Sequence, residues 1–296
     1  MNKSILSFII VTSSLLCLPQ YIFGQELDAP ANDEVVQKVK FARLKSKENK
    51  SMMTALRLIE KGVINEEDDI NEVSGGVEQL IAVGEGAIPK CLTSFQRMAK
   101  TDRQLYLTVA LDSILLDDDL HIALDLCNRK TPTEVYIYLM SRWADSARDD
   151  SSEVLLAHLK NDSEEVQYHC VRGLIRRGDD SVVAACIQII DTRWKDSKQQ
   201  LRRDFSGMAR GIMSSIIEEK LTTPNKKSRL LGLHLFELFG VKENANLLAD
   251  NLNNSDTALR LGAINACRVV VAGEEPLLRP SMTELIELAN SWSDKI

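Results

Sequence analysis

Apolar residues recur every three to four positions from Asn32 to the end of the chain, and no stretch alternates apolar and polar residues as a β-strand does. A helix places residues with this spacing on one face, which must be covered by another element. The 296-residue chain has only 14 Gly and 7 Pro, too few for the many turns of a β-sandwich or barrel. The pattern therefore predicts an all-α protein.

The composition narrows the class of protein further. Apolar residues make up 44% of the chain, aromatic residues 5%, and the formal net charge is −7. These values are ordinary for a globular protein and exclude a collagen-like or disordered chain. A net negative charge also argues against a basic nucleic-acid-binding domain.

Residues 1–24 have the composition of a secretory signal peptide. Lys3 provides a short positive region, an apolar run follows from Ile5 to Leu18, and Pro19 and Gly24 precede the expected cleavage before Gln25. The apolar run is shorter than the ~20 residues of a membrane-spanning helix. We therefore expect export to the periplasm or exterior of a bacterial cell, with a retained N-terminal anchor as the alternative.

Five cysteines remain after this cleavage. Their number is odd, their spacing is wide, and neither a CxxC motif nor a cluster with zinc-ligand spacing occurs. Each lies among apolar residues, which is typical of a thiol that packs in a core. The sequence predicts buried free thiols, without a disulfide or a metal, at Cys91, Cys127, Cys170, Cys186 and Cys267.

Residues 25–74 read as a charged helical segment. Asn32 can cap a helix that carries Val35, Val36, Val39 and Leu44, and a second helix is expected from Ser51 to Gly62. The acidic run 65–72 lacks the glycine and the regular spacing of a calcium-binding loop, so we expect a solvated connector there.

A helical hairpin is predicted immediately afterwards. The short helix Val77–Val83 ends at Gly84, Glu85 and Gly86 form a turn, and Pro89 lies in the first turn of the next helix, where its missing N–H is harmless. This arrangement resembles the HEAT-like repeat, particularly the short bacterial variety first associated with bilin lyases.

Two later helices support the resemblance because one offset along the chain aligns them at three positions. Placing Val166 on Leu259 also places Cys170 on Ala263 and Leu174 on Cys267, as expected for two long or three short repeats. A long helix over 198–219, followed by Pro224, departs from the pattern. The resemblance implies an α-solenoid of stacked antiparallel helix pairs over residues 75–292, with five to seven pairs between about 32 and 290.

No recognisable catalytic motif was found. The sequence contains no GxSxG, GxxxxGK[ST] or HExxH pattern. The run Asp117–Asp119 before His121 is interpreted as an acidic helix start, because consecutive residues on a helix point in different directions. His158, His169 and His234 are interpreted as partly buried structural residues. We expect no catalytic residue, cofactor or metal.

Charge is distributed unevenly along the chain. Residues 60–86 contain eight acidic residues and one basic residue, whereas residues 193–229 contain ten basic and four acidic residues. An excess of one sign can mark a binding surface or a merely solvated face. The candidate residues for contact with an acidic partner, or with another copy of the chain, are Arg202, Arg203, Arg210, Lys226 and Lys227.

These features predict a non-enzymatic, exported scaffold for protein–protein interaction. Stacked helix pairs present an extended surface that suits a protein or peptide partner. Alternatives from other classes are an accessory subunit of an envelope enzyme complex, a lyase-like enzyme on the same repeat scaffold, and a self-associating structural protein of the cell envelope.

Overall fold

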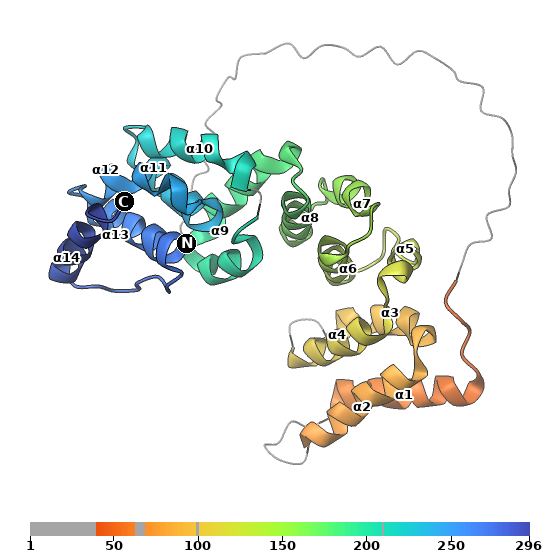
Figure 1. Ribbon diagram of the computed structural model, residues 1–296. Coiled ribbons are helices and arrows are strands. Elements are labelled where there is room, and N and C mark those ends of the chain that lie inside the picture. Colours follow the sequence, from red (N-terminus) through yellow and green to blue (C-terminus); the bar gives the residue numbers. More distant parts are fainter. Residues whose placement is uncertain (1–39, 63–68, 99–100, 209) are drawn as a thin grey trace, which may run out of the picture. The chain divides into compact units, whose positions relative to one another are not determined.

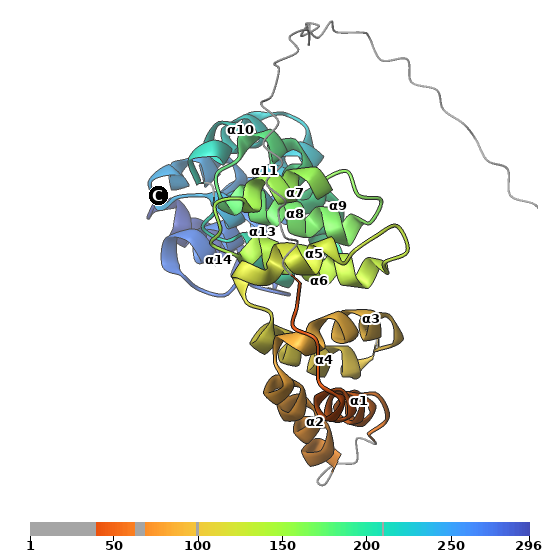
Figure 2. The same ribbon diagram turned by 90° about the vertical axis from the view of Figure 1, so that its right-hand side faces the viewer.

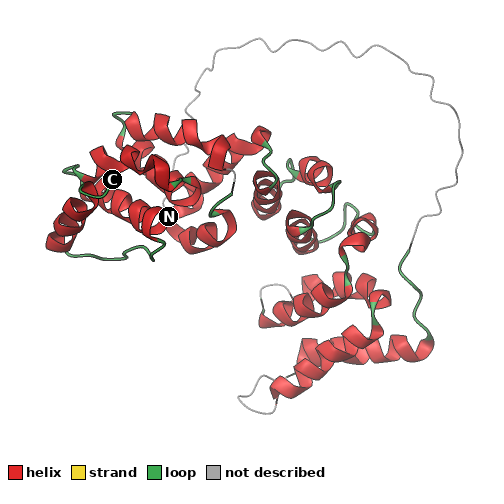
Figure 3. Cartoon of the chain, viewed as in Figure 1, coloured by secondary structure: helices red, strands yellow, loops and turns green. Residues whose placement is uncertain are grey.

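The computed structural model describes residues 40–62, 69–98, 101–208 and 210–296 (Figure 1). Within these ranges every regular element is a helix and no strand occurs (Figure 3), so the predicted all-α class is confirmed. The leader and the helix proposed over 32–39 lie outside the described residues. None of the described helices combines the length and apolar content that crossing a membrane requires.

The α-helices share the same construction of a buried apolar face and a solvated polar face, and short 3-10 turns join several of them. In chain order they are α1 Ser46–Lys61, α2 Asp69–Val83, α3 Ile88–Met98, α4 Asp102–Ile114, α5 Leu120–Asp125, α6 Thr133–Asp145, α7 Ser151–His158, α8 Glu164–Arg176, α9 Val183–Phe205, α10 Arg210–Thr222, α11 Lys226–Phe239, α12 Ala249–Leu252, α13 Thr257–Ala266 and α14 Met282–Ser293.

The first described helix begins at a different place from the one that the sequence pattern predicted. Residues 40–45 are not helical, so the helix expected to reach Leu44 is wrong there, and α1 begins at Ser46 instead of Ser51. The Glu48 side chain explains this start, because it accepts a hydrogen bond from the N–H of the N-cap residue Lys45 at 2.7 Å. The predicted end of this helix at Gly62 is confirmed.

Helix α2 extends across the expected boundary between residues 74 and 75. The short helix predicted from Val77 is therefore wrong at its start, and residues 69–72 belong to a helix and not to a connector. Gly76 does not begin a new unit. It lets α1 and α2 approach closely, since a Cβ there would meet the Ala55 carbonyl oxygen at 3.0 Å.

The predicted turn after α2 is confirmed. Gly84 has φ = 77°, a conformation that favours glycine, and Pro89 lies in the first turn of α3. The extended segment before α1 packs here as well, because a Cβ on Gly86 would lie 2.5 Å from the Leu44 side chain.

The predicted single helix over 198–219 is wrong. Helix α9 ends at Phe205 and α10 begins at Arg210, with a turn between them at which Gly207 has φ = 76°. The Gly207 N–H donates to the Leu238 carbonyl at 2.9 Å, so this turn is tied to α11. A single helix over 198–219 would bury Leu201, Phe205, Met208, Ile212 and Ile216 on one face. Leu201 and Phe205 are buried, but after the turn the buried residues are Met213, Ile217 and Leu221 instead.

Five helices begin at regular steps along the chain. The N-cap residues of α4, α6, α8, α11 and α13 are Thr101, Pro132, Ser163, Asn225 and Asp256. The step from Thr101 to Pro132, called the repeat interval below, recurs between α6 and α8 and between α11 and α13. The step between α8 and α11 is twice as long.

The double step contains a break in α9, where Ser197 has the non-helical angles φ −132° and ψ 20°. The offset that aligns Val166 with Leu259 in the sequence equals three repeat intervals, because it also carries Ser163 onto Asp256.

Another helix precedes each of these regularly spaced helices and packs on it. The contacting pairs are α3 with α4, α5 with α6, α7 with α8, α10 with α11, and α12 with α13. Contacts also run in chain order from α6 to α8, α9, α11 and α13 (Figures 1 and 2). Between α4 and α6 the order changes, because among the helices that precede it α6 packs on α3 and α5 more than on α4.

One hydrophobic core runs through these contacts. It includes four of the five cysteines predicted to be buried, Cys91, Cys170, Cys186 and Cys267, whereas Cys127 is partly exposed. All five are free thiols. Burial raises the pKa of Cys91, Cys170, Cys186 and Cys267 to about 12, so these thiols stay protonated at neutral pH and act as small apolar side chains.

The close packing of α8 provides a test of this fold. Gly173 faces α6, and a Cβ there would lie 2.7 Å from the Ala144 Cα and 2.6 Å from the Leu155 side chain. We expect Gly173→Ala to lower the free energy of unfolding by about 1–3 kcal/mol, because overpacking separates the helices. Urea denaturation followed by circular dichroism measures this change.

The matched control is Gly211→Ala in α10, where nothing lies within 4 Å of the position that an added Cβ would take. Alanine favours a helix over glycine, so this variant should be unchanged or more stable by up to about 1 kcal/mol. Equal destabilisation by the two substitutions would contradict the packing of α8 on α6.

Candidate functional site

The predicted basic residues do not form one exposed group. Arg202 lies in α9, with its side chain only 16% exposed, and its Nε donates to Glu237 of α11, whose side chain is 3% exposed. The Arg202 guanidinium also lies 5.4 Å from the ring centroid of Trp194. This arginine is therefore a structural partner between two helices and not a free surface charge.

Two of the other candidates are also paired within the chain. The Lys226 Nζ lies 2.5 Å from Asp256, the N-cap of α13, and the Lys227 Nζ lies 2.9 Å from Asp191 of α9. Arg203 lies on α9, one residue after Arg202. Arg210 begins α10, but its side chain lies outside the described part of the chain. The positive charge is thus spread over three helices and largely compensated.

A polar network that sequence reasoning missed joins α6, α8 and α9. Arg172 of α8 donates to Asp145 of α6 at 2.6 Å and lies 3.8 Å from Asp204 of α9. The hydroxyl of Tyr168 donates to the same Asp204, and the Arg193 guanidinium covers the Tyr168 ring at 5.0 Å. The positive charge of Arg172 is thus neutralised by carboxylates on the helices at either side of α8.

A second network joins α4 and α6. Asp112 accepts hydrogen bonds from the Tyr138 hydroxyl at 3.0 Å and from Arg142 at 2.9 Å, while Arg142 also donates to the Leu115 carbonyl at 2.8 Å. Burial raises the pKa of Tyr138 above its ordinary value, so its hydroxyl remains a donor. The only hint in the sequence is the presence of charged residues inside otherwise apolar helical patterns.

The acidic helix start was predicted correctly. Asp117–Asp119 form a short helical turn immediately before α5. Asp117 lies 3.4 Å from Arg142, and Asp118 lies 3.3 Å from Arg148. These carboxylates are therefore partners for arginines of the next helical unit. Within the described residues, no three His, Cys, Asp or Glu side chains converge as metal ligands would.

Two of the histidines, His169 and His234, are partly buried, in line with the structural role that the sequence predicted. Burial lowers the pKa of His169 and of His234 to about 4, so both rings are neutral at pH 7. His234 stacks on Trp194 with the ring centroids 4.1 Å apart and the planes inclined by 16°. The geometry of His234 is that of a packing residue between α9 and α11.

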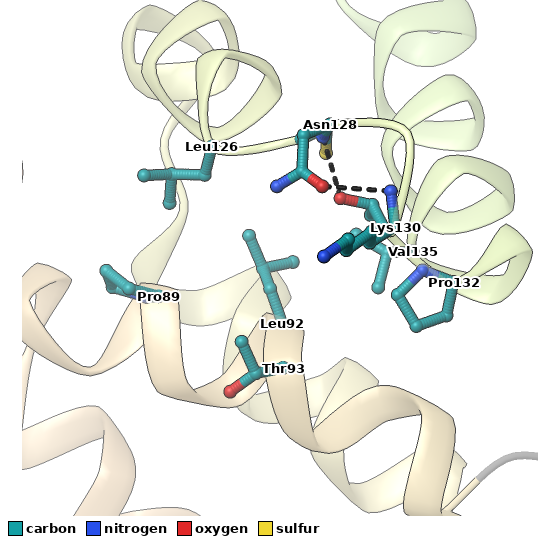
Figure 4. Close-up of a pocket in the computed structure, with 10 residues that line it drawn as sticks. Pro89, Leu92, Thr93, Leu126, Asn128, Lys130, Pro132 and Val135 are labelled. Carbon is teal, nitrogen blue, oxygen red and sulfur yellow. Dashed lines mark hydrogen bonds between the residues drawn. The ribbon is translucent and has the colours of Figure 1, made fainter.

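A surface pocket of about 260 Å³ lies between α3 and the loop 126–132 that joins α5 to α6 (Figure 4). Asn128 shapes the loop, because its N–H donates to the Thr131 hydroxyl at 2.8 Å and its side chain accepts from the Lys130 N–H at 2.9 Å. The apolar lining residues of the pocket are Pro89, Leu92, Leu126, Pro132 and Val135.

Cys127 also lines this pocket. Burial raises the pKa of its thiol to about 11, although the Thr131 side chain acts in the opposite direction. A protonated thiol is a poor nucleophile and a poor metal ligand at neutral pH. The pocket is therefore apolar inside with polar groups at its edge, which suits the binding of a side chain.

Comparison of the chain with models of protein families, with curated proteins and with solved structures finds no match in any of the three. The functional evidence is therefore the chain's own sequence and geometry.

The pair between Arg202 and Glu237 can be tested by substitution. We expect Arg202→Ala to lower the free energy of unfolding by about 3 kcal/mol, because Glu237 is left as a buried charge without its partner. Arg203→Ala, one residue further along α9, should change it by less than about 0.5 kcal/mol. Equal losses for the two variants would show that Arg202 is a solvated charge.

His234 should make stability depend on pH. Its folded pKa of about 4 lies below its ordinary value of 6.5, so the unfolded chain binds more protons between these values. Its contribution to stability is therefore complete above pH 6.5 and decreases as the pH falls towards 4. Nearby charges on Asp191, Lys198 and Arg202 modify this pKa less than burial does.

The measurement is denaturant unfolding of the wild type and His234→Phe at several pH values. Phenylalanine retains a ring against Trp194 but cannot titrate. The stability of the wild type relative to the variant should fall between pH 6.5 and pH 4. A constant difference across this range would mean that His234 binds its proton equally well in the folded and in the unfolded chain.

Proposed function

We propose that the chain is a non-enzymatic, exported scaffold for protein–protein interaction, built of HEAT-like repeats in an α-solenoid. The observation that carries this proposal is the regular start of α4, α6, α8, α11 and α13, at one repeat interval or at twice that interval. A constant interval with a constant local structure is the mark of a repeat protein.

The caps of the repeated helices support the same interpretation. The Asn161 side chain accepts from the Ser163 N–H at 2.9 Å, and the Asn254 side chain accepts from the Asp256 N–H at 2.9 Å, three intervals later. Ser163 and Asp256 in turn accept from N–H groups in the first turns of α8 and α13. The same capping hydrogen bonds therefore begin α8 and α13 at equivalent positions of the repeat.

The order of helix contacts also favours a solenoid. In a stack of helix pairs each unit contacts its neighbours in the sequence, as α6, α8, α9, α11 and α13 do. Such a stack exposes a long surface made from equivalent residues, which suits an extended partner. We propose that this repeat domain spans the predicted residues 75–292, and that α1 and the first turns of α2 precede it, with α1 and α2 packed together as an additional helix pair.

The partner is proposed to be a protein that inserts an apolar side chain into the pocket between α3 and the loop 126–132. The pocket volume of about 260 Å³ accommodates a side chain and not a large cofactor. An acidic segment of the partner would contact Arg203, Arg210, Lys226 and Lys227. The side chains of Lys226 and Lys227 are exposed, although each is paired with an aspartate. Exposed ion pairs are weak, so these lysines can exchange the aspartate for a carboxylate of the partner.

The test is cross-linking of the exported chain in its native envelope, followed by purification and mass spectrometry. We expect Leu126→Asp to lose the partners recovered by the wild type, because a carboxylate at the pocket edge opposes insertion of an apolar side chain. Raising the salt from ~50 to ~500 mM should weaken recovery, as screening shortens the reach of the basic residues.

Leu156→Asp is the matched control, since Leu126 and Leu156 are 44% and 43% exposed and Leu156 lies outside the pocket. It should recover the same partners as the wild type. If the wild type, Leu126→Asp and Leu156→Asp all recover the same partners in the same amounts, the pocket is excluded as the binding site. A substrate converted by the purified chain would exclude a purely non-enzymatic role.

A further inference from the structure

One helix face of the repeat array is left uncovered. The residue eight positions after the N-cap is fully buried in four of the repeated helices, as Met140, Val171, Leu233 and Ile264. The equivalent residue of α4 is Val109, which is 47% exposed, and Leu105, one turn earlier, is 65% exposed. The same repeat position is therefore buried in the core in α6, α8, α11 and α13 but exposed at the surface in α4.

The cause is the change in packing after α4. Between α11 and α13 the following helix covers this position closely, since a Cβ on Gly262 would lie 2.9 Å from Leu233. The next of the regularly spaced helices after α4 is α6, but its hydrogen bonds reach only Asp112 and Leu115 at the end of α4. Leu105 and Val109 thus lack the helix that would cover them.

A second uncovered apolar face lies on the last helix of the chain. Met282 and Ile286 of α14 are 55% and 46% exposed and lie four residues apart, on one face. Leu278, just before the helix, is exposed as well. Nine large apolar side chains are exposed in the described residues, and six of them belong to these two faces. They are Leu105, Val109 and Leu116 at α4, and Leu278, Met282 and Ile286 at α14.

We propose that two copies of the chain associate head to tail, with α14 of one copy packed antiparallel on α4 of the next. In this register Met282 lies opposite Val109 and Ile286 lies opposite Leu105, because both pairs have the same spacing of four residues. Leu278 then lies at the end of α4 where Leu116 is exposed. Antiparallel helices also align their dipoles favourably.

The charges at the ends of the two faces are complementary. Asp102 and Asp112 flank the α4 face on the same side of the helix, at spacings of three residues from Leu105 and Val109. Arg279 is exposed in the non-helical segment just before α14, which approaches the end of α4 that carries Asp112. The Asp112 side chain is 48% exposed beside its pair with Arg142, while the uncharged Asn290 lies near Asp102. Two α4 faces would instead bring carboxylates together, which opposes a contact between identical faces.

A contact between two different faces has a defined consequence. Each copy retains one free α4 face and one free α14 face, so association continues into chains or closes into a ring. This inference is independent of the proposed binding function, because neither face includes the pocket between α3 and the loop 126–132. A self-associating chain can still bind another protein.

The test is sedimentation velocity of the purified chain over a series of concentrations, for the wild type and the variants Leu105→Glu and Ile286→Glu. We expect the wild type to form species larger than a monomer and each variant to be a monomer. Both residues are exposed, so the variants should fold, which circular dichroism checks. Leu156→Glu, on α7, is the control and should associate like the wild type.

An equimolar mixture of the two variants decides the type of contact. The Leu105→Glu copy retains its α14 face, and the Ile286→Glu copy retains its α4 face, so the mixture should form a dimer that grows no further. A wild type that remains a monomer at every concentration overturns the proposal. Association of Leu105→Glu alone, or of Ile286→Glu alone, overturns it too, since it would show a contact between identical faces.

Discussion

Each helix of this chain has an apolar face that only a neighbouring helix can cover, and the rest of the structure depends on this constraint. Helices such as α7 and α12 are too short to be stable alone, so their stability comes from packing on the next helix. The repeat interval sets which residues meet, since it returns an equivalent helix to an equivalent place. Where the packing changes, between α4 and α6, apolar side chains become exposed on α4.

Close approach of the helices depends on small residues at a few points. Gly76 brings α2 against α1, Gly173 brings α8 against α6, and Gly262 brings α13 against Leu233 of α11. A sequence pattern treats a glycine as a helix end or a turn, which is correct at Gly84, where φ is positive. Inside a helix, a glycine instead allows another helix to pack closely. The role of a glycine as a helix end or as a packing position can be told apart only when the neighbouring helix is known.

The sequence was sufficient for the class and for most helix positions because apolar spacing and capping residues are local signals. It was insufficient at 198–219, where the spacing continues smoothly through Gly207 although a hydrogen bond to Leu238 of another helix fixes a turn there. The pocket was missed for a similar reason, since Leu92 and Val135 meet only when α3 packs on α6. The proposed partner residues were found as charges, but their pairing with Glu237, Asp256 and Asp191 depends on tertiary contacts.

The ion pairs show why a window of charge along the sequence is a poor guide to the surface of such a protein. Pairs between helices join residues about one interval apart: 30 residues for Arg142 and Asp112, 31 for Arg176 and Asp145, and 28 for Arg193 and Glu165. A basic stretch therefore faces whatever lies one interval before or after it, and the stretch 193–229 faces carboxylates on both sides. Charge becomes available to a partner where this pairing is absent, or where the pair is exposed and therefore weak. In a repeat chain, the surface charge of a helix should therefore be judged together with the helices one interval away.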